Sequence, residues 1–259
     1  MKILVTNDDG IFAPGLWTLA KELKSIAQIV VVAPDREQSA TGTAVTLRQP
    51  LRVQRVTPII QDIETFSVEG TSSDGVILAL GKLIDSKVDL VISGINQGLN
   101  LGDDVLISGT VGAALQAYLR GLPAIAVSVA TPKSPYLDNS ARLATLLAQK
   151  IYNNALPSDI FLNINLPDLP LAKIKGIKPT ELAHRTHIDT VEEGHDGRRE
   201  FYWLFRQRLS ADADENTDIW VLEQGNISIT SLQTALFQKP LSAITDSLCS
   251  DLFQELKQY

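Results

Sequence analysis

The feature that most constrains the fold is a repeated order of short apolar run, helical pattern and second apolar run. Ile3 to Val5 and Ile29 to Ala33 are continuous apolar runs, as expected for strands buried on both faces. Between them, residues 16 to 24 carry apolar side chains at helical spacing. This strand-helix-strand order predicts parallel strands joined by right-handed crossovers, with helices on both faces of the sheet.

The same order continues along the chain. An exposed or edge strand is expected between residues 46 and 56. Further strands are expected at residues 65–68, 89–93, 124–129 and 160–164, and helices at 73–84, from 109, and at 138–153. We therefore predict an α/β core with a mainly parallel sheet over residues 1–170.

The character of the sequence changes after Pro167. A strand is expected from Lys173 to Pro179, and residues 201–208 and 219–222 are interpreted as the strands of a separate hairpin. Residues 227–230 alternate, and residues 241–258 have helical spacing. We interpret residues 171–259 as a C-terminal extension, with a hairpin and a terminal helix, that serves oligomerisation.

Composition excludes several classes of protein. The net charge of −7 argues against a general affinity for nucleic acid, which requires clustered Lys and Arg. Cys249 is the only cysteine, so neither a disulfide framework nor a cysteine-based zinc site is expected. The first residues contain no signal peptide, and no apolar stretch approaches the roughly 20 residues needed to cross a bilayer. A cytoplasmic location is the expectation.

An acidic loop directly follows the first strand. Asp8 and Asp9 come at the carboxyl end of that strand, the edge of an open parallel sheet at which ligands bind. With Gly10 at a positive φ, the chain can turn and bring both carboxylates together. Two anionic groups at one point require a cation, and carboxylate oxygens suit Mg²⁺ or Mn²⁺. The alternative is an ordinary turn, since Asn, Asp and Gly all favour turns.

Three more polar loops fall at the same edge. Ser39 lies beyond the second strand, and Asn96 lies in a glycine-rich loop where its amide oxygen can complete a metal site. Ser108 is a plausible N-cap of a helix that begins Gly109-Thr110, and such a helix start is a phosphate cradle. The alternatives are an exposed connection at Ser39 and close helix-on-sheet packing at the small residues.

The four motifs together resemble the survival protein SurE family, in which they occur in the same order, at residues 3–10, 32–42, 93–100 and 108–114. The resemblance extends to Thr217-Asp218 and to residues 225–230. It implies a metal-dependent nucleotidase that hydrolyses nucleoside 5′- and possibly 3′-monophosphates, in a family of which some members also cleave short polyphosphate. It also implies a Rossmann-like three-layer core and an extension that exchanges elements between subunits in a homodimer or homotetramer.

By this resemblance, Asp8, Asp9, Ser39 and Asn96 correspond to the ligands of one divalent cation per subunit, Mg²⁺ or Mn²⁺. Either aspartate is expected to activate water. Substrate phosphate is expected at Ser108, Gly109 and Thr110, and more weakly at Asn7 and Asn100. The chain departs from the family at residues 70–75 and at Ile107, where the family usually has tyrosine. These departures leave the predicted metal ligands unchanged and bear on substrate preference.

Two other functions compete with this interpretation. One is a phosphatase with a covalent aspartyl-phosphate, although such enzymes typically space their two aspartates one residue apart. The other is a non-catalytic nucleotide-binding regulator, for which paired carboxylates without a metal are costly. His184, His187 and His195 follow the core and are interpreted as exposed or interface residues.

Overall fold

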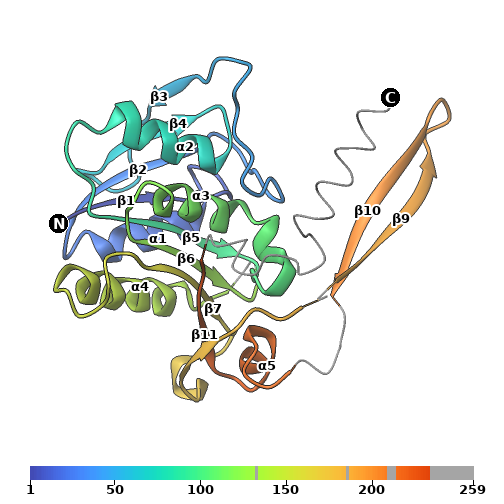
Figure 1. Cartoon of the computed structure of the whole chain (residues 1–259). Helices are drawn as coiled ribbons and strands as arrows, with labels where there is room; N and C mark the ends of the chain where they lie inside the picture. The colour runs from blue at the N-terminus through green and yellow to red at the C-terminus, as the bar shows by residue number, and fades with distance from the viewer. Residues whose placement is uncertain (132–133, 185–186, 209–213, 234–259) are drawn as a thin grey trace, which may run out of the picture.

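The computed structural model describes residues 1–131, 134–184, 187–208 and 214–233, and in these residues nine strands form one twisted sheet (Figure 1). Its strand order is β3-β4-β2-β1-β5-β6-β7-β11-β8. The strands of the sheet are β1 (Lys2–Thr6), β2 (Gln28–Pro34), β3 (Val53–Arg55), β4 (Glu64–Val68), β5 (Leu90–Gln97), β6 (Ala124–Val129), β7 (Phe161–Leu166), β8 (Ile177–Thr180) and β11 (Ile227–Ser231).

Helices cover both faces of this sheet, as the strand-helix-strand pattern predicts. They are α1 (Pro14–Leu23), α2 (Ser72–Leu78), α3 (Gly109–Tyr118), α4 (Leu137–Tyr152) and α5 (Asp218–Glu223), with the π-helical turn η1 (Ala79–Leu83) and the 3-10 turns η2 (Gly102–Leu106) and η3 (Leu171–Lys173). The strands from β4 through β7 pair in parallel, while β3 and β11 pair antiparallel to their neighbours β4 and β7. The prediction of a three-layer α/β fold with a mainly parallel sheet is confirmed.

The core lies in two layers because successive side chains of a buried strand point to opposite faces. In β1, Ile3 and Val5 pack with α1 and α4, whereas Leu4 between them packs with α2 and α3. All three side chains are completely buried. Burial of an Ile, Leu or Val side chain contributes about 1.5–3 kcal/mol, so this first strand is firmly fixed before its polar end is reached.

The connections leave the sheet in opposite directions at β1 and β5, its two central strands. The crossover from β1 through α1 leads to β2 on one side, and the crossover from β5 through α3 leads to β6 on the other. Helices α1 and α3 pack on opposite faces of the sheet. A crevice therefore opens between the carboxyl ends of β1 and β5, where open α/β sheets bind their ligands.

The C-terminal part of the chain differs from the prediction. The hairpin pairs β9 (His187–His195) with β10 (Glu200–Arg208) in antiparallel register and projects from the body of the molecule (Figure 1). The predicted strand at residues 219–222 is wrong, because this segment forms α5, which begins at the N-cap Thr217. The apolar run there lies on a buried helix face, with Ile219, Val221 and Leu222 all buried.

Strands β8 and β11 belong to the predicted extension, yet they join the same sheet as the core. The division of the chain near residue 170 remains a prediction. Strands on both sides of this residue belong to one sheet. The predicted helix over residues 241–258 lies outside the described residues. In the part of the chain that the structure describes, no helix has the length and apolar character needed to span a membrane.

Candidate active site

The acidic loop forms a tight turn at the end of β1. Gly10 adopts a φ of 103°, as predicted, and a Cβ at this position would lie 3.2 Å from the carbonyl carbon of Arg36. Asn7 closes the turn, because its side-chain amide donates a hydrogen bond to the Gly10 carbonyl oxygen at 3.1 Å. Asn7 is fully buried beneath this turn, so its part in the site is to shape the backbone that presents Asp8 and Asp9.

Asp8 lies against the start of α3. Its side chain is only 4% exposed, and one carboxylate oxygen accepts a hydrogen bond from the Thr110 hydroxyl. Gly109 permits this approach, since a Cβ there would lie 2.8 Å from both Cβ and Oδ2 of Asp8. Ser108 caps the helix by accepting from the amide of Val111 at 3.1 Å, as predicted. The N-terminus of α3 is therefore already in contact with a carboxylate of the protein, that of Asp8.

Both carboxyl groups of the acidic pair have raised pKa values. Burial raises the pKa of Asp8, while hydrogen bonds from Thr110 act in the opposite direction. The pKa of Asp9 is raised to about 6, first by burial and then by the negative charge of Asp8. Oδ2 of Asp9 is buried and has no hydrogen-bond partner. A positive charge beside the two carboxyl groups would stabilise their ionised forms, so a bound cation would lower both pKa values.

Ser39 and Asn96 bring further oxygen atoms to the same place. The Ser39 hydroxyl donates to Oε1 of Glu37 at 2.6 Å, which leaves lone pairs on its oxygen. The Asn96 amide nitrogen donates to the Gly98 carbonyl at 2.7 Å, which fixes the orientation of the amide group and leaves Oδ1 available. Together with Asp8, both residues line a small open pocket of about 140 Å³. Its lining is Asp8, Ser39, Ala40, Asn96, Asn100, Asp104, Ile107 and Ser108.

The donor set fits a hard divalent cation. Among the described residues, no three His, Cys, Asp or Glu side chains come together as a metal centre. Of the four residues predicted as metal ligands, Asp8, Ser39 and Asn96 line this pocket, and Asp9, the next residue of the acidic loop, does not. A set made only of oxygen atoms would suit Mg²⁺ or Mn²⁺, and the Oδ2 atom of Asp9 has no hydrogen-bond partner that would compete with a cation.

The structure thus brings Asp8, Ser39, Asn96, Asn100 and Ser108 to one pocket, with Gly109 and Thr110 directly behind Asp8. The sequence interpretation missed the residues that support Asn100, namely Ser128, Asn163 and Asn165, and the contact of Asp218 with the Gly102 amide. The signal was available for β7, where two asparagines interrupt an apolar core strand. Buried polar side chains in such a strand need partners, and here the partners lie in the site.

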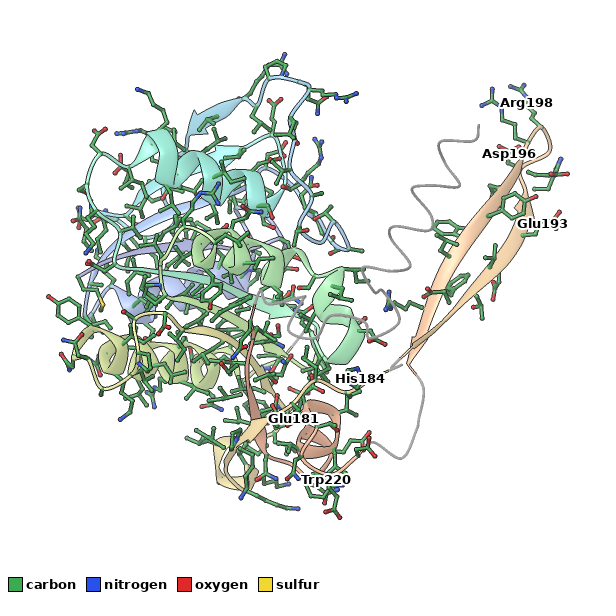
Figure 2. The ribbon with its side chains drawn as sticks, in the orientation of Figure 1. Glu181, His184, Glu193, Asp196, Arg198 and Trp220 are labelled. Atoms are coloured by element: carbon green, nitrogen blue, oxygen red, sulfur yellow. The ribbon has the colours of Figure 1, made fainter. Side chains whose placement is uncertain are left out.

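The histidines lie elsewhere. His184 and His195 are exposed, as predicted, and Figure 2 shows His184 near the base of the hairpin, with Glu193, Asp196 and Arg198 toward its tip. Nδ1 of His195 accepts a hydrogen bond from the Gly197 amide at 2.9 Å, a contact within the hairpin turn. His187 belongs to β9, and its side chain lies outside the described residues. The hairpin does reach the rim of the pocket through Arg206, which pairs with Asp104 at 3.1 Å.

Fold and site together define a Rossmann-like α/β protein with an acidic pocket at the topological switch point of its sheet. Comparison with known proteins gives the family. The profile of the family described as Survival protein SurE matches residues 3–189, and the chain belongs to this family. The family predicted from the four sequence motifs is therefore confirmed.

Close relatives align along almost the whole chain. The chain is similar to a protein named 5′-nucleotidase SurE from Dehalococcoides mccartyi (strain CBDB1), with 57% identity over 95% of this chain and 94% of the relative. It is 45% identical to the protein of the same name from Legionella pneumophila (strain Paris), over 90% of each chain. The crystal structure of the SurE protein from Aquifex aeolicus has a TM-score of 0.77 and 34% identity, covering 99% of this chain and all of that one.

Proposed function

We propose that this chain is a metal-dependent 5′-nucleotidase, a phosphomonoesterase that hydrolyses nucleoside monophosphates to nucleoside and phosphate. The observation that carries the proposal is the pair of adjacent carboxylates at the switch point of the sheet, Asp8 buried and Asp9 partly buried, with one oxygen of Asp9 unpartnered. Relatives at 42–57% identity that bear the name 5′-nucleotidase support the activity. They disfavour both an aspartyl-phosphate phosphatase and a non-catalytic nucleotide-binding protein.

The residues that would hold one divalent cation in each subunit are Asp8, Asp9, Ser39 and Asn96. Such an ion, Mg²⁺ or Mn²⁺, supplies a positive charge that offsets the two carboxylates and polarises the substrate phosphate. The protein prepares this site in advance, because Gly10 sets the turn and Thr110 fixes the orientation of Asp8. A preorganised site avoids rearrangement during the reaction.

The protein supplies the remaining roles from the same pocket. One carboxylate of the acidic pair, Asp8 or Asp9, would accept the proton of the attacking water. Asn100 lines the same pocket as Asp8 and would donate to a phosphate oxygen. The first turn of α3, with Ser108, Gly109 and Thr110, directs the positive end of the helix toward the same point.

The test is phosphate release from 5′-AMP by the purified full chain, with Mn²⁺ or Mg²⁺ added after dialysis against chelator. Wild-type protein is expected to turn over only with metal, and Asp9→Asn is expected to be inactive with an unchanged circular dichroism spectrum. Asp85→Asn is the matched control, because Asp85 is exposed and far along the sequence from the pocket. Full activity of Asp9→Asn, or equal turnover in chelator, would refute the proposal. A panel of 3′-nucleotides and short polyphosphates in the same assay gives the substrate preference.

Assembly into a homodimer or homotetramer is part of the proposal. The hairpin of residues 187–208 carries large apolar side chains that are unusually exposed, with Leu204 at 78% and Trp203 at 62%. Exposed apolar surface of this kind marks a protein–protein contact. Light scattering should give a dimer or tetramer for wild type and a smaller species for Leu204→Lys. Ile59→Lys is the control, because Ile59 is an equally large exposed residue outside the hairpin.

A further inference from the structure

The backbone of residues 100–102, between β5 and α3, is held by side chains from the C-terminal half of the chain. Asn165 on β7 makes two hydrogen bonds to Asn100, accepting from its backbone amide at 2.9 Å and donating to its carbonyl oxygen at 3.0 Å. Asn163, two residues earlier on the same strand, donates to the same carbonyl oxygen at 2.8 Å. Both polar groups of the Asn100 backbone are thereby fixed.

The other end of this segment is held from the C-terminal extension. Oδ2 of Asp218, at the start of α5, accepts from the Gly102 amide at 2.8 Å. Its second oxygen accepts from the amides of Ala183 at 3.0 Å and Ile219 at 2.9 Å. Asp218 is completely buried, so one carboxylate links the pocket loop to α5 and to the segment that leads into the hairpin.

Asn100, the residue held by the first anchor, lines the acidic pocket. Its side-chain amide nitrogen donates one hydrogen bond to the Ser128 hydroxyl on β6 at 2.8 Å. One N–H and the amide oxygen remain, on a residue that lines the pocket beside Asp8 and Ser39. The anchors therefore decide where these two polar groups of Asn100 point.

Placing these polar side chains in the core is unfavourable for the stability of the protein. Asn163, Asn165 and Asp218 are all fully buried, and burial of polar groups is unfavourable unless they are hydrogen-bonded. Sheet pairing does not require them, because β7 forms its ladders to β6 and β11 through the backbone. Well-packed apolar residues would serve stability as well as a buried polar network does. What the polar side chains add is a single fixed conformation for residues 100–102.

We propose that Asn165 and Asp218 are positioning residues of the active site, which clamp residues 100–102 from two sides and so aim the Asn100 side chain at the substrate phosphate. This inference rests on the proposed nucleotidase function, since the phosphate is that of its substrate. Asn165 acts on the Asn100 backbone directly. Asp218 fixes the following turn and makes the geometry of the pocket depend on how the C-terminal extension docks.

The test is a double-mutant cycle between Asn165→Ala and Asn100→Ala, measured as kcat/KM for 5′-AMP with saturating metal. Asn165→Ala alone is expected to lower kcat/KM by roughly 10- to 100-fold, the scale of a small misplacement of a contact group. In the Asn100→Ala background, the same change is expected to cost less than about threefold, because nothing is left to aim. If the fold losses in kcat/KM of the two single variants multiply in the double variant, the proposal is overturned, because Asn165 then does not act through Asn100.

Ser228→Ala is the matched control. Ser228 lies opposite Asn165 in the register of β11 with β7, is equally buried, and its hydroxyl has no hydrogen-bond partner. This variant is expected to keep wild-type kcat/KM. A loss in Ser228→Ala as large as that in Asn165→Ala would mean that any disturbance of this part of the core has the same effect, and would overturn the proposal.

Hydrogen exchange gives a readout that does not depend on activity. The Asn100 and Gly102 amides are expected to exchange slowly in wild type, and at least about tenfold faster in Asn165→Ala and Asp218→Asn respectively. An unchanged exchange rate of the Asn100 amide in Asn165→Ala would overturn the proposal. This result does not depend on whether Asp218→Asn folds. If the wild-type chain hydrolyses no nucleotide, the proposed function fails, while the exchange experiment still tests the clamp.

Discussion

Removing one charge from the acidic pair is expected to stabilise the metal-free protein while it destroys the site. In Asp9→Asn the partly buried carboxylate becomes a neutral amide of nearly the same size. The raised pKa of Asp9 means that the folded chain holds the ionised group in an unfavourable place, against burial and against the charge of Asp8. The free energy of unfolding at neutral pH should therefore rise in the variant.

The magnitude follows from the pKa. The rise from 3.8 to about 6 makes the folded state bind this proton more tightly than the unfolded state does. The native contribution of Asp9 is therefore fully favourable below pH 3.8 and is lost as the pH rises toward 6. At about 1.4 kcal/mol for each pH unit, the loss approaches 3 kcal/mol, and partial solvent exposure of Asp9 brings the expected gain in Asp9→Asn to about 1–3 kcal/mol.

Urea unfolding in chelator measures this difference. Wild type, Asp9→Asn and the exposed control Asp85→Asn are compared at pH 7.5 and pH 4.5. The variant should be more stable at pH 7.5, and most of its advantage should disappear at pH 4.5, where wild-type Asp9 is protonated in the folded state. Added Mn²⁺ should then stabilise wild type by mass action and leave Asp9→Asn almost unchanged, which reverses the order of stability.

Two results would refute this reasoning. If metal-free Asp9→Asn were less stable than wild type at pH 7.5, the carboxylate would already be satisfied by the protein and no cation would be needed. If Mn²⁺ stabilised both proteins equally, the metal would bind at a place that does not include Asp9. Asp85→Asn separates a local effect from the general effect of one negative charge fewer.

Three further predictions follow, two on the residues that contact Asp8 and one on metal dependence. Gly109→Ala should abolish nucleotidase activity, because the added methyl group collides with Asp8 at 2.8 Å, whereas Gly81→Ala, in open space, should not. Thr110→Val should lower metal-dependent activity and cost about 1–3 kcal/mol of stability in urea unfolding at neutral pH, because it leaves a buried carboxylate oxygen without its donor. Thr110→Ser, which keeps the hydroxyl, should retain most of the activity. Dialysis against chelator should abolish AMP hydrolysis reversibly, with recovery on addition of Mn²⁺ or Mg²⁺ in a phosphate-release assay.

The sheet and the acidic pocket were open to prediction because their signals are local. Continuous apolar runs such as Ile29 to Ala33 indicate buried strands, and the carboxyl ends of parallel strands meet at one edge. Placing polar loops after those strands was enough to bring Asp8 and Ser39 to one pocket, whereas Asn96 reaches it from within β5, which continues to Gln97, beyond the predicted end at residue 93. The turn at Gly10 followed from residue type alone.

What could not be predicted depends on contacts between distant segments. The segment at residues 219–222 has strand-like composition, but its N-cap Thr217 and the docking of Asp218 against Gly102 make it a helix. Nothing within residues 161–166 says that the two asparagines of β7 serve a loop more than sixty residues earlier. Such partners become visible only when the fold has brought them together.

The place of β11 has a consequence for how the polypeptide is made. Although it is near the end of the described chain, β11 lies in the sheet between β7 and β8 and covers the edge of β7. A chain that has been synthesised only through β7 therefore has an open sheet edge, whose unpaired backbone N–H and C=O groups are a template for pairing with other chains. The nascent protein becomes safe from aggregation only after residue 231 has left the exit tunnel.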